Sequence, residues 1–148
     1  MIADDDELVA ELASQVLISA GHACGWVTDG KKAMELLEWR RPDLLLLDQN
    51  MPELSGSSVL RKLRTSPQLY DLPVIMFTAV TGAEDEKQAF YHGAQDYIRK
   101  PFNEKMLLWR VNQILETRKQ LPKHVTLQES MARSSGQLKE VPQNRSVL

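Results

Sequence analysis

The stretch 44-LLLLDQNMP-52 decides the fold of this chain. It opens with an apolar run, Leu44 to Leu47, which ends abruptly in the carboxylate of Asp48. A run that is apolar at every position is typical of a parallel strand covered on both faces, because a strand with one wet face alternates apolar and polar residues. Residues 74–77 repeat this design and lead into Thr78. The sequence therefore predicts a buried parallel sheet whose strands end in polar side chains.

Shorter apolar segments alternate with stretches of helical period around these two strands. Further strands are predicted at 1–3, 23–28 and 97–98. The helices carry apolar stripes, which are Leu8, Val9, Leu12, Ala13, Val16 and Leu17 in the first, Ala33, Leu36 and Leu37 in the second, and Met106, Leu107, Val111, Ile114 and Leu115 in the last. Five strands alternating with five helices predict an α/β fold with a doubly wound parallel sheet, because right-handed crossovers place helices on both faces.

The composition fits a single domain from a reducing compartment. The 148 residues carry a formal net charge of -2, which gives no electrostatic reason for direct binding to nucleic acid or to an anionic membrane. The one cysteine, Cys24, cannot form an intramolecular disulfide and is predicted to be a buried thiol. No segment offers the roughly 20 apolar residues of a membrane-spanning helix, and no signal-peptide pattern follows Met1. We therefore expect a cytoplasmic protein.

The pattern of strands and helices fades near residue 118. Residues 119–148 are polar, with prolines, serines and only isolated apolar positions. Because chains below roughly 40 residues seldom fold without a partner or staples, this stretch is too short for a conventional output domain. We predict a folded domain at 1–118 and a flexible polar tail or linker at 119–148.

Five polar side chains fall at the predicted strand ends: Asp4, Asp5, Asp48, Thr78 and Lys100. In open α/β sheets the ligand crevice lies beyond the carboxyl ends of the strands, so these residues should converge. Three carboxylates in one place repel each other unless a cation neutralises them. Ligands that are all oxygen suit a hard ion such as Mg²⁺.

The same residue types suit phosphoryl transfer. The carboxylate of Asp48 is best placed to attack phosphorus and form an acyl phosphate. The Lys100 ammonium can pair with phosphoryl oxygens, and the Thr78 hydroxyl can donate a hydrogen bond to the same group. The sequence therefore favours a phosphoacceptor site on Asp48.

Four segments resemble the receiver domain of two-component response regulators of the single-domain chemotaxis type. They are the acid pair Asp4 and Asp5, 48-DQNMPELSG-56, 77-FTA-79 and 97-YIRKPF-102. The gaps of 43 residues from Asp5 to Asp48, 30 to Thr78 and 22 to Lys100 are also similar to the family's spacing. The resemblance implies a flavodoxin-like sheet in the order 2-1-3-4-5 over residues 1–118.

The resemblance further implies the metal ligands and the phosphodonor. Asp5 and Asp48 would bind Mg²⁺ through their carboxylates, Asn50 through its backbone carbonyl, and Asp4 mainly through water. A histidine kinase or a phosphotransfer protein would be the donor. The chain would then be no enzyme beyond catalysing its own phosphorylation and dephosphorylation. A cis peptide bond between Lys100 and Pro101 is also implied.

Thr78 and Tyr97 are the switch residues that the resemblance implies. Phosphorylation would draw the Thr78 hydroxyl toward the phosphoryl group and let the ring of Tyr97 turn inward. This change would alter the face formed by the fourth helix, fifth strand and fifth helix, which would signal to an effector protein or an output domain. A homodimer is left open by the sequence.

Two other functions remain as alternatives, and two positions depart from the family pattern. A haloacid-dehalogenase-like phosphatase also uses an aspartyl nucleophile, but it needs acidic ligands after its lysine, and no Asp follows Lys100. A receiver-like interaction module that is never phosphorylated is the other alternative.

Only three residues precede Asp4, so the first strand should be short. Val80 stands where many family members carry a polar residue, which could affect partner choice or phosphoryl lifetime.

Overall fold

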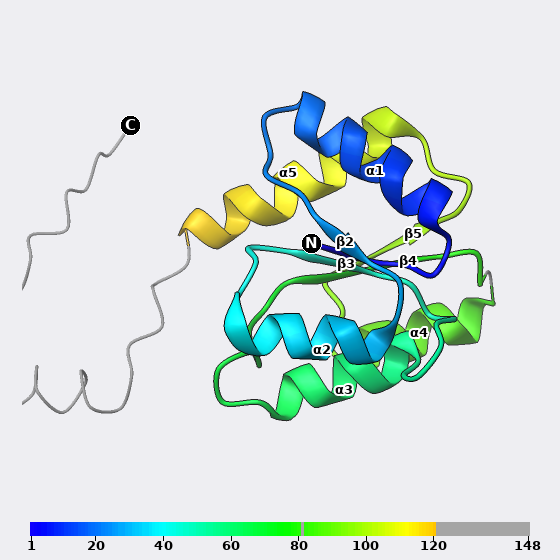
Figure 1. Ribbon diagram of the computed structural model, residues 1–148, viewed down its shortest axis with the longest axis vertical. Helices are drawn as coiled ribbons and strands as arrows, with labels where there is room; N and C mark the ends of the chain where they lie inside the picture. The colour runs from blue at the N-terminus through cyan, green and yellow to red at the C-terminus, as the bar shows by residue number, and fades with distance from the viewer. Residues whose placement is uncertain (81, 121–148) are drawn as a thin grey trace, which may run out of the picture. The chain divides into compact units, whose positions relative to one another are not determined.

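The computed structural model describes residues 1–80 and 82–120, in which five strands alternate with five helices (Figure 1). The elements are β1 (Ile2–Ala3), α1 (Glu7–Ser19), β2 (Trp26–Val27), α2 (Gly30–Trp39), β3 (Leu45–Leu47), α3 (Gly56–Thr65), β4 (Val74–Thr78), α4 (Ala83–Tyr91), β5 (Asp96–Arg99) and α5 (Glu104–Gln120). Most of the tail predicted at 119–148 lies outside the described residues.

The strands form one parallel sheet in the order β2-β1-β3-β4-β5, so the predicted fold class is confirmed. β2 is shorter than the predicted strand at 23–28 because β1 offers it only two partners, with Ile2 level with Trp26 and Ala3 level with Val27. The amino group of Met1 extends β1 by donating a hydrogen bond of 3.0 Å to the carbonyl oxygen of Leu44.

The helices cover the sheet from both sides (Figure 1). α1 and α5 lie on one face, and α2, α3 and α4 lie on the other. Alternate residues of β4 supply the two cores: Val74 and Met76 pack toward α2 and α3, whereas Ile75 and Phe77 pack toward α1 and α5. The buried runs at 44–47 and 74–77 are apolar throughout because each of these strands must fill both cores.

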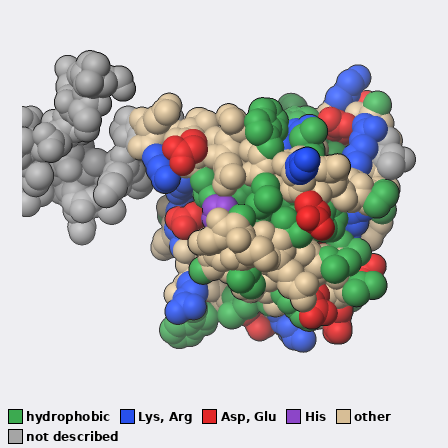
Figure 2. Space-filling model, turned by 90° about the horizontal axis from the view of Figure 1, so that it is seen from above, with side chains coloured by type: hydrophobic (Ala, Val, Ile, Leu, Met, Phe, Trp, Pro, Cys, Tyr) green, Lys and Arg blue, Asp and Glu red, His purple; other side chains and the backbone are tan. Residues whose placement is uncertain are grey.

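The apolar stripe predicted for α1 is partly wrong. Leu8 and Leu12 are 65% and 47% exposed, and the helix packs on the sheet through Ala10, Ala13 and Leu17. These three positions repeat at the 3.6-residue period, and their short side chains let the helix approach the strands. Leu36 in α2 and Met106 in α5, also assigned to inner faces, are exposed as well. Hydrophobic side chains are accordingly visible among charged ones on the α1 and α5 side of the molecule (Figure 2).

Two smaller features of the fold concern Asp6 and the predicted buried thiol of Cys24. Asp6 caps α1, since its Oδ1 accepts a hydrogen bond of 3.2 Å from the Val9 N–H. Cys24 is half-buried rather than buried, because it lies on the short connection before β2. Within the part of the chain that the structure describes, no helix is both long and apolar enough to cross a membrane.

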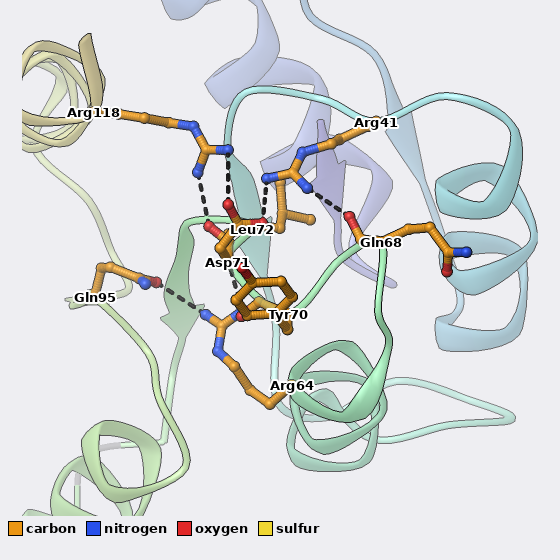
Figure 3. A network of polar contacts seen from close by, with 8 residues as sticks. All are labelled: Arg41, Arg64, Gln68, Tyr70, Asp71, Leu72, Gln95 and Arg118. Carbon is orange, nitrogen blue, oxygen red and sulfur yellow. Dashed lines mark hydrogen bonds and ion pairs between the residues drawn. The ribbon is translucent and has the colours of Figure 1, made fainter. Parts of the chain in front are cut away.

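A polar network braces the connection between α3 and β4 (Figure 3). The Arg64 guanidinium, which comes from α3, donates hydrogen bonds to the carbonyl oxygens of Tyr70, Leu72 and Gly93 and to Gln95 Oε1. Arg41 and Arg118 reach Asp71 from two other parts of the chain, at 2.8 Å and 3.8 Å respectively. The network therefore ties α3, the connection around Asp71 and the α4–β5 turn together.

Candidate functional site

The sheet register brings the first two acidic residues together. Ala3 is level with Leu47, so the next residues along their strands, Asp4 and Asp48, lie side by side at the carboxyl end of the sheet. The Asp48 N–H donates to the Ala3 carbonyl oxygen at 2.9 Å, which continues the ladder to this point. Both carboxylates are buried. Ionised side chains are seldom buried unless they have a partner of opposite charge.

Lys100 supplies the positive charge that these carboxylates need. Its ammonium lies 2.5 Å from Asp4 Oδ2 and 3.4 Å from Asp48 Oδ2, with only 13% of the side chain exposed. Lys100 follows β5, and its N–H donates to the Thr78 carbonyl oxygen at 3.0 Å. The predicted convergence of Asp4, Asp48 and Lys100 is therefore present. The peptide bond between Lys100 and Pro101 is cis, as the resemblance implied.

Asp5 completes an acidic cluster. One carboxylate oxygen from each of Asp4, Asp5 and Asp48 lies within 4.8 Å of the others. Burial raises the pKa of Asp4, and the hydrogen bond from Lys100 only partly offsets this effect. Loss of hydration and the nearness of Asp48 raise the pKa of Asp5, although this side chain is still exposed. The single positive charge of Lys100 therefore does not neutralise the three carboxylates of the cluster.

The donor set fits a hard divalent cation. Asp4 Oδ2 is buried and, apart from its ion pair with Lys100, has no hydrogen-bond partner among the described residues. All candidate ligand atoms in the cluster are carboxylate oxygens, which such ions prefer. A cation here would relieve the repulsion that raises these pKa values. Asn50 lies exposed on the connection after β3, and its role as a backbone ligand stays a prediction.

Two residues that the sequence did not single out hold the Asp48 carboxylate. The Gln49 N–H donates to Asp48 Oδ1 at 2.8 Å. The Gln49 side chain is fixed in turn, because its Oε1 accepts from the N–H and the hydroxyl of Ser57 at 2.9 Å and 2.7 Å. Only the folded loop brings Gln49 to the start of α3, so no pattern in the sequence could reveal this support.

Gly56, part of the recognised motif, has a steric role in the same loop. A Cβ atom at this position would collide with the carbonyl oxygen of Asp48. The Gly56 N–H donates to the Gln49 carbonyl oxygen at 2.9 Å. Any larger residue would therefore push the loop away from Asp48.

The two predicted switch residues meet at the backbone of Val80. Thr78 is the buried last residue of β4, and its hydroxyl oxygen accepts from the Val80 N–H at 3.3 Å. Tyr97 is also buried, and its hydroxyl donates to the Val80 carbonyl oxygen at 2.7 Å. Burial, followed by the charges of Asp85 and Glu86, raises the pKa of Tyr97, so its hydroxyl remains a donor at neutral pH. The ring of Tyr97 thus already points inward.

Comparison with known proteins agrees with this geometry. The family model described as the response regulator receiver domain matches residues 1–112. The DNA-binding dual master transcriptional regulator RpaA of Synechocystis sp. is 34% identical over 97% of this chain and 58% of its own length. The phosphate regulon transcriptional regulatory protein PhoB of Pseudomonas aeruginosa is 37% identical over 78% of this chain and 50% of its own length. The chain thus spans about half the length of the curated relatives it matches.

The solved structures lead to the same family. A putative response regulator from Chloroflexus aurantiacus superimposes with a TM-score of 0.74 at 34% identity, covering 78% of this chain and 94% of that one. The family match covers most of the sequence. It agrees with the sheet order, with the acidic cluster at the carboxyl edge of the sheet and with the lysine that faces this cluster. The chain belongs to the response regulator receiver domain family of two-component systems.

Proposed function

We propose that this receiver accepts a phosphoryl group on Asp48 in a Mg²⁺-dependent reaction. The observation that carries the proposal is the position of the Lys100 ammonium, 2.5 Å from Asp4 and 3.4 Å from Asp48, beside an acidic cluster that fits a divalent cation. A purely structural ion pair would need one carboxylate, whereas three gather here. A receiver-like module that is never phosphorylated would have no use for such a cluster, whose charges cost stability.

Each residue has a role in the transfer. An Asp48 carboxylate oxygen would form the bond to phosphorus, while the bond from phosphorus to the donor's histidine nitrogen breaks and that nitrogen keeps the electron pair. The Gln49 N–H holds Asp48 Oδ1 at 2.8 Å, which leaves Oδ2 on the side of Lys100. The ammonium of Lys100 and the hydroxyl of Thr78 would then stabilise the phosphoryl oxygens.

The metal would be held by the carboxylates of Asp5 and Asp48, by the backbone carbonyl of Asn50 and, through water, by Asp4. When bound there, Mg²⁺ would neutralise the phosphoryl oxygens and the acidic cluster. Beyond its own phosphorylation and dephosphorylation, we assign the chain no catalysis.

The donor would be a histidine kinase or a phosphotransfer protein that docks beside Lys100. A groove of about 710 Å³ lies there, lined by α1 residues such as Leu12 and Val16 and by Pro101, Phe102 and Leu108. The exposed Leu8 adds apolar surface on α1. Leu8, Leu12 and Val16, which the helical pattern assigned to the core, are therefore available to a partner.

The output surface would be the face of α4, β5 and α5. Met106 and Trp109 of α5 are exposed apolar side chains, and they line a groove on this face together with Glu86 of α4 and Arg99 of β5. Ion pairs join Arg99 to Glu86 and Arg110 to Asp96 across the same elements. This face would bind an effector protein, an output domain or a second copy of the chain. The name of the relative RpaA includes DNA binding, but we assign no direct contact with DNA to residues 1–118.

The test is phosphorylation with acetyl phosphate. Wild-type protein incubated with acetyl phosphate and Mg²⁺ should gain the mass of one phosphoryl group, and Asp48→Asn should abolish the gain. Asp43→Asn, which changes an exposed acidic residue just before β3, is the matched control and should be phosphorylated normally. An unmodified wild-type protein that still folds and binds Mg²⁺ would refute the proposal.

A further inference from the structure

Phe77 occupies the row of the sheet that contains the phosphoacceptor. Leu47 is level with Met76, so Asp48 is level with Phe77, and Asp4 lies on the other side of Asp48 in the same row. Residues that are level in a parallel sheet point to the same face. Phe77 is fully buried in the core beneath α1 and α5. Its ring therefore lies on the same face of the sheet as the side chains of Asp4 and Asp48.

The Lys100 ammonium lies over this ring. Its nitrogen is 5.2 Å from the centroid of the Phe77 ring, within the roughly 6 Å range of a cation–π interaction. Among the described residues, the ammonium thus has three close partners: a carboxylate oxygen of Asp4, one of Asp48, and the Phe77 ring. Phe102, two residues after Lys100, packs against Phe77 in a T-shaped arrangement with 5.4 Å between centroids. The contact with Phe102 therefore helps to fix the orientation of the Phe77 ring.

The Phe77 ring differs from the two carboxylates because its attraction for the Lys100 ammonium does not depend on a charge that changes during the reaction. The carboxylate charge on Asp48 disappears when its oxygen forms the acyl phosphate, and Asp4 belongs to the acidic cluster, where a bound cation would compete with Lys100 for its charge. The attraction of the Phe77 ring for the ammonium survives both events. A lysine side chain is flexible and strongly hydrated, so a fixed ring limits the positions that its ammonium can take.

We propose that Phe77 is a positioning residue for Lys100, holding its ammonium beside Asp48 through a cation–π interaction before and during phosphoryl transfer. The inference rests on the proposed function of Asp48 as phosphoacceptor. It assigns Phe77 no contact with the phosphoryl group, since the ring acts only through Lys100.

The experiment varies the electrons of the ring while keeping its shape. Phe77 is replaced, in the full 148-residue chain, by mono-, di- and trifluorophenylalanine, and the initial rate of phosphorylation by acetyl phosphate is measured at saturating Mg²⁺. Because fluorine withdraws charge from the ring face, the rate should fall stepwise, by about threefold to tenfold in total. The same series at Phe90, an exposed ring on α4, is the matched control and should give no such trend.

A second readout needs neither metal nor phosphodonor. In the metal-free protein, the ε-methylene protons of Lys100 should show an upfield ring-current shift in NMR spectra, and Phe77→Leu should abolish it while the fold is retained. A flat fluorination series would overturn the positioning role, and so would the absence of the ring-current shift. If wild-type protein took no phosphoryl group at all, the proposed function would fail, and the NMR shift alone would then decide whether the ring holds the ammonium.

Discussion

Lys100 and Asp4 form an ion pair in which the ammonium lies 2.5 Å from a fully buried carboxylate oxygen. Breaking such a pair leaves a buried charge without a partner, which is costly. Lys100→Met should therefore lower the free energy of unfolding by about 2–3 kcal/mol, slightly below the range for fully buried pairs because Lys100 retains some exposure. Urea denaturation of the metal-free protein measures this loss.

A double-mutant cycle gives the control for the ion pair. Asp4→Asn combined with Lys100→Met removes both charges, so the double variant should be more stable than Lys100→Met alone. Equal stabilities would mean that the ammonium does not compensate Asp4 in solution.

Asp5→Asn should stabilise the metal-free protein and weaken Mg²⁺ binding at the same time. The pKa of Asp5 is raised by lost hydration and by Asp48, so its charge is unfavourable in the fold. The gain should stay below about 1 kcal/mol because the side chain is exposed and screened. Denaturation with and without Mg²⁺, together with calorimetric titration, separates the two effects. A variant with unchanged stability but lost Mg²⁺ affinity would contradict the charge argument.

Gln49→Leu should slow phosphorylation without disrupting the fold. The substitution leaves the Ser57 N–H without its acceptor, which costs about 1 kcal/mol. The loop that orients Asp48 would then be less fixed, and we expect a rate loss of roughly threefold. Acetyl phosphate kinetics provide the measurement. Ser57→Ala, which keeps the N–H donor and loses only the hydroxyl, should have a smaller effect on the rate.

Arg64→Lys should destabilise the fold although it preserves charge. The guanidinium donates to carbonyl oxygens of Tyr70, Leu72 and Gly93, and an ammonium cannot reach all of them. The partly buried carbonyl oxygens of Leu72 and Gly93 would lose a donor, which should lower the free energy of unfolding by about 2 kcal/mol. Arg61→Lys, at an exposed position on the same helix, is the matched control and should be nearly neutral. Similar midpoints for both variants would show that the network contributes little.

Asp71 should make the stability of the protein fall in acid. Burial pushes the pKa of Asp71 up, but the hydrogen bond and charge of Arg41 and the charge of Arg118 outweigh it and hold the pKa below its usual value. As the pH falls, the unfolded chain therefore binds this proton first. The stabilisation is complete above about pH 4 and is lost as the pH falls through the lower, folded-state pKa.

The pH dependence is measured as the stability difference between wild type and Asp71→Asn. This difference should be constant near neutrality and shrink below about pH 4. Glu38→Gln, at an exposed carboxylate on α2, should show no comparable change. A difference that grows in acid would mean that the sign of the pKa shift is wrong.

Much of the fold could be predicted because its signals are local. The apolar runs at 44–47 and 74–77 identify strands buried on both faces, and the number and order of elements follow from their alternation with helices. The stripes were less reliable because apolar residues occur around more than one side of a helix. Leu8 and Leu12 are exposed, whereas Ala10 lies against the sheet. Sequence periodicity cannot distinguish a core contact from a surface left open for a partner.

The sequence by itself determined which chemical groups stand at the strand ends: Asp4, Asp5, Asp48, Thr78 and Lys100. Parallel strands of one sheet must end at the same edge, so their convergence required no coordinates. Only the tertiary structure decided the contacts that set the site's energetics. These are the seat of Lys100 over the Phe77 ring, the support of Asp48 by Gln49 and Ser57, and the closure of Tyr97 on Val80. Each depends on register, loop path and rotamer, which arise from packing between residues distant in the chain.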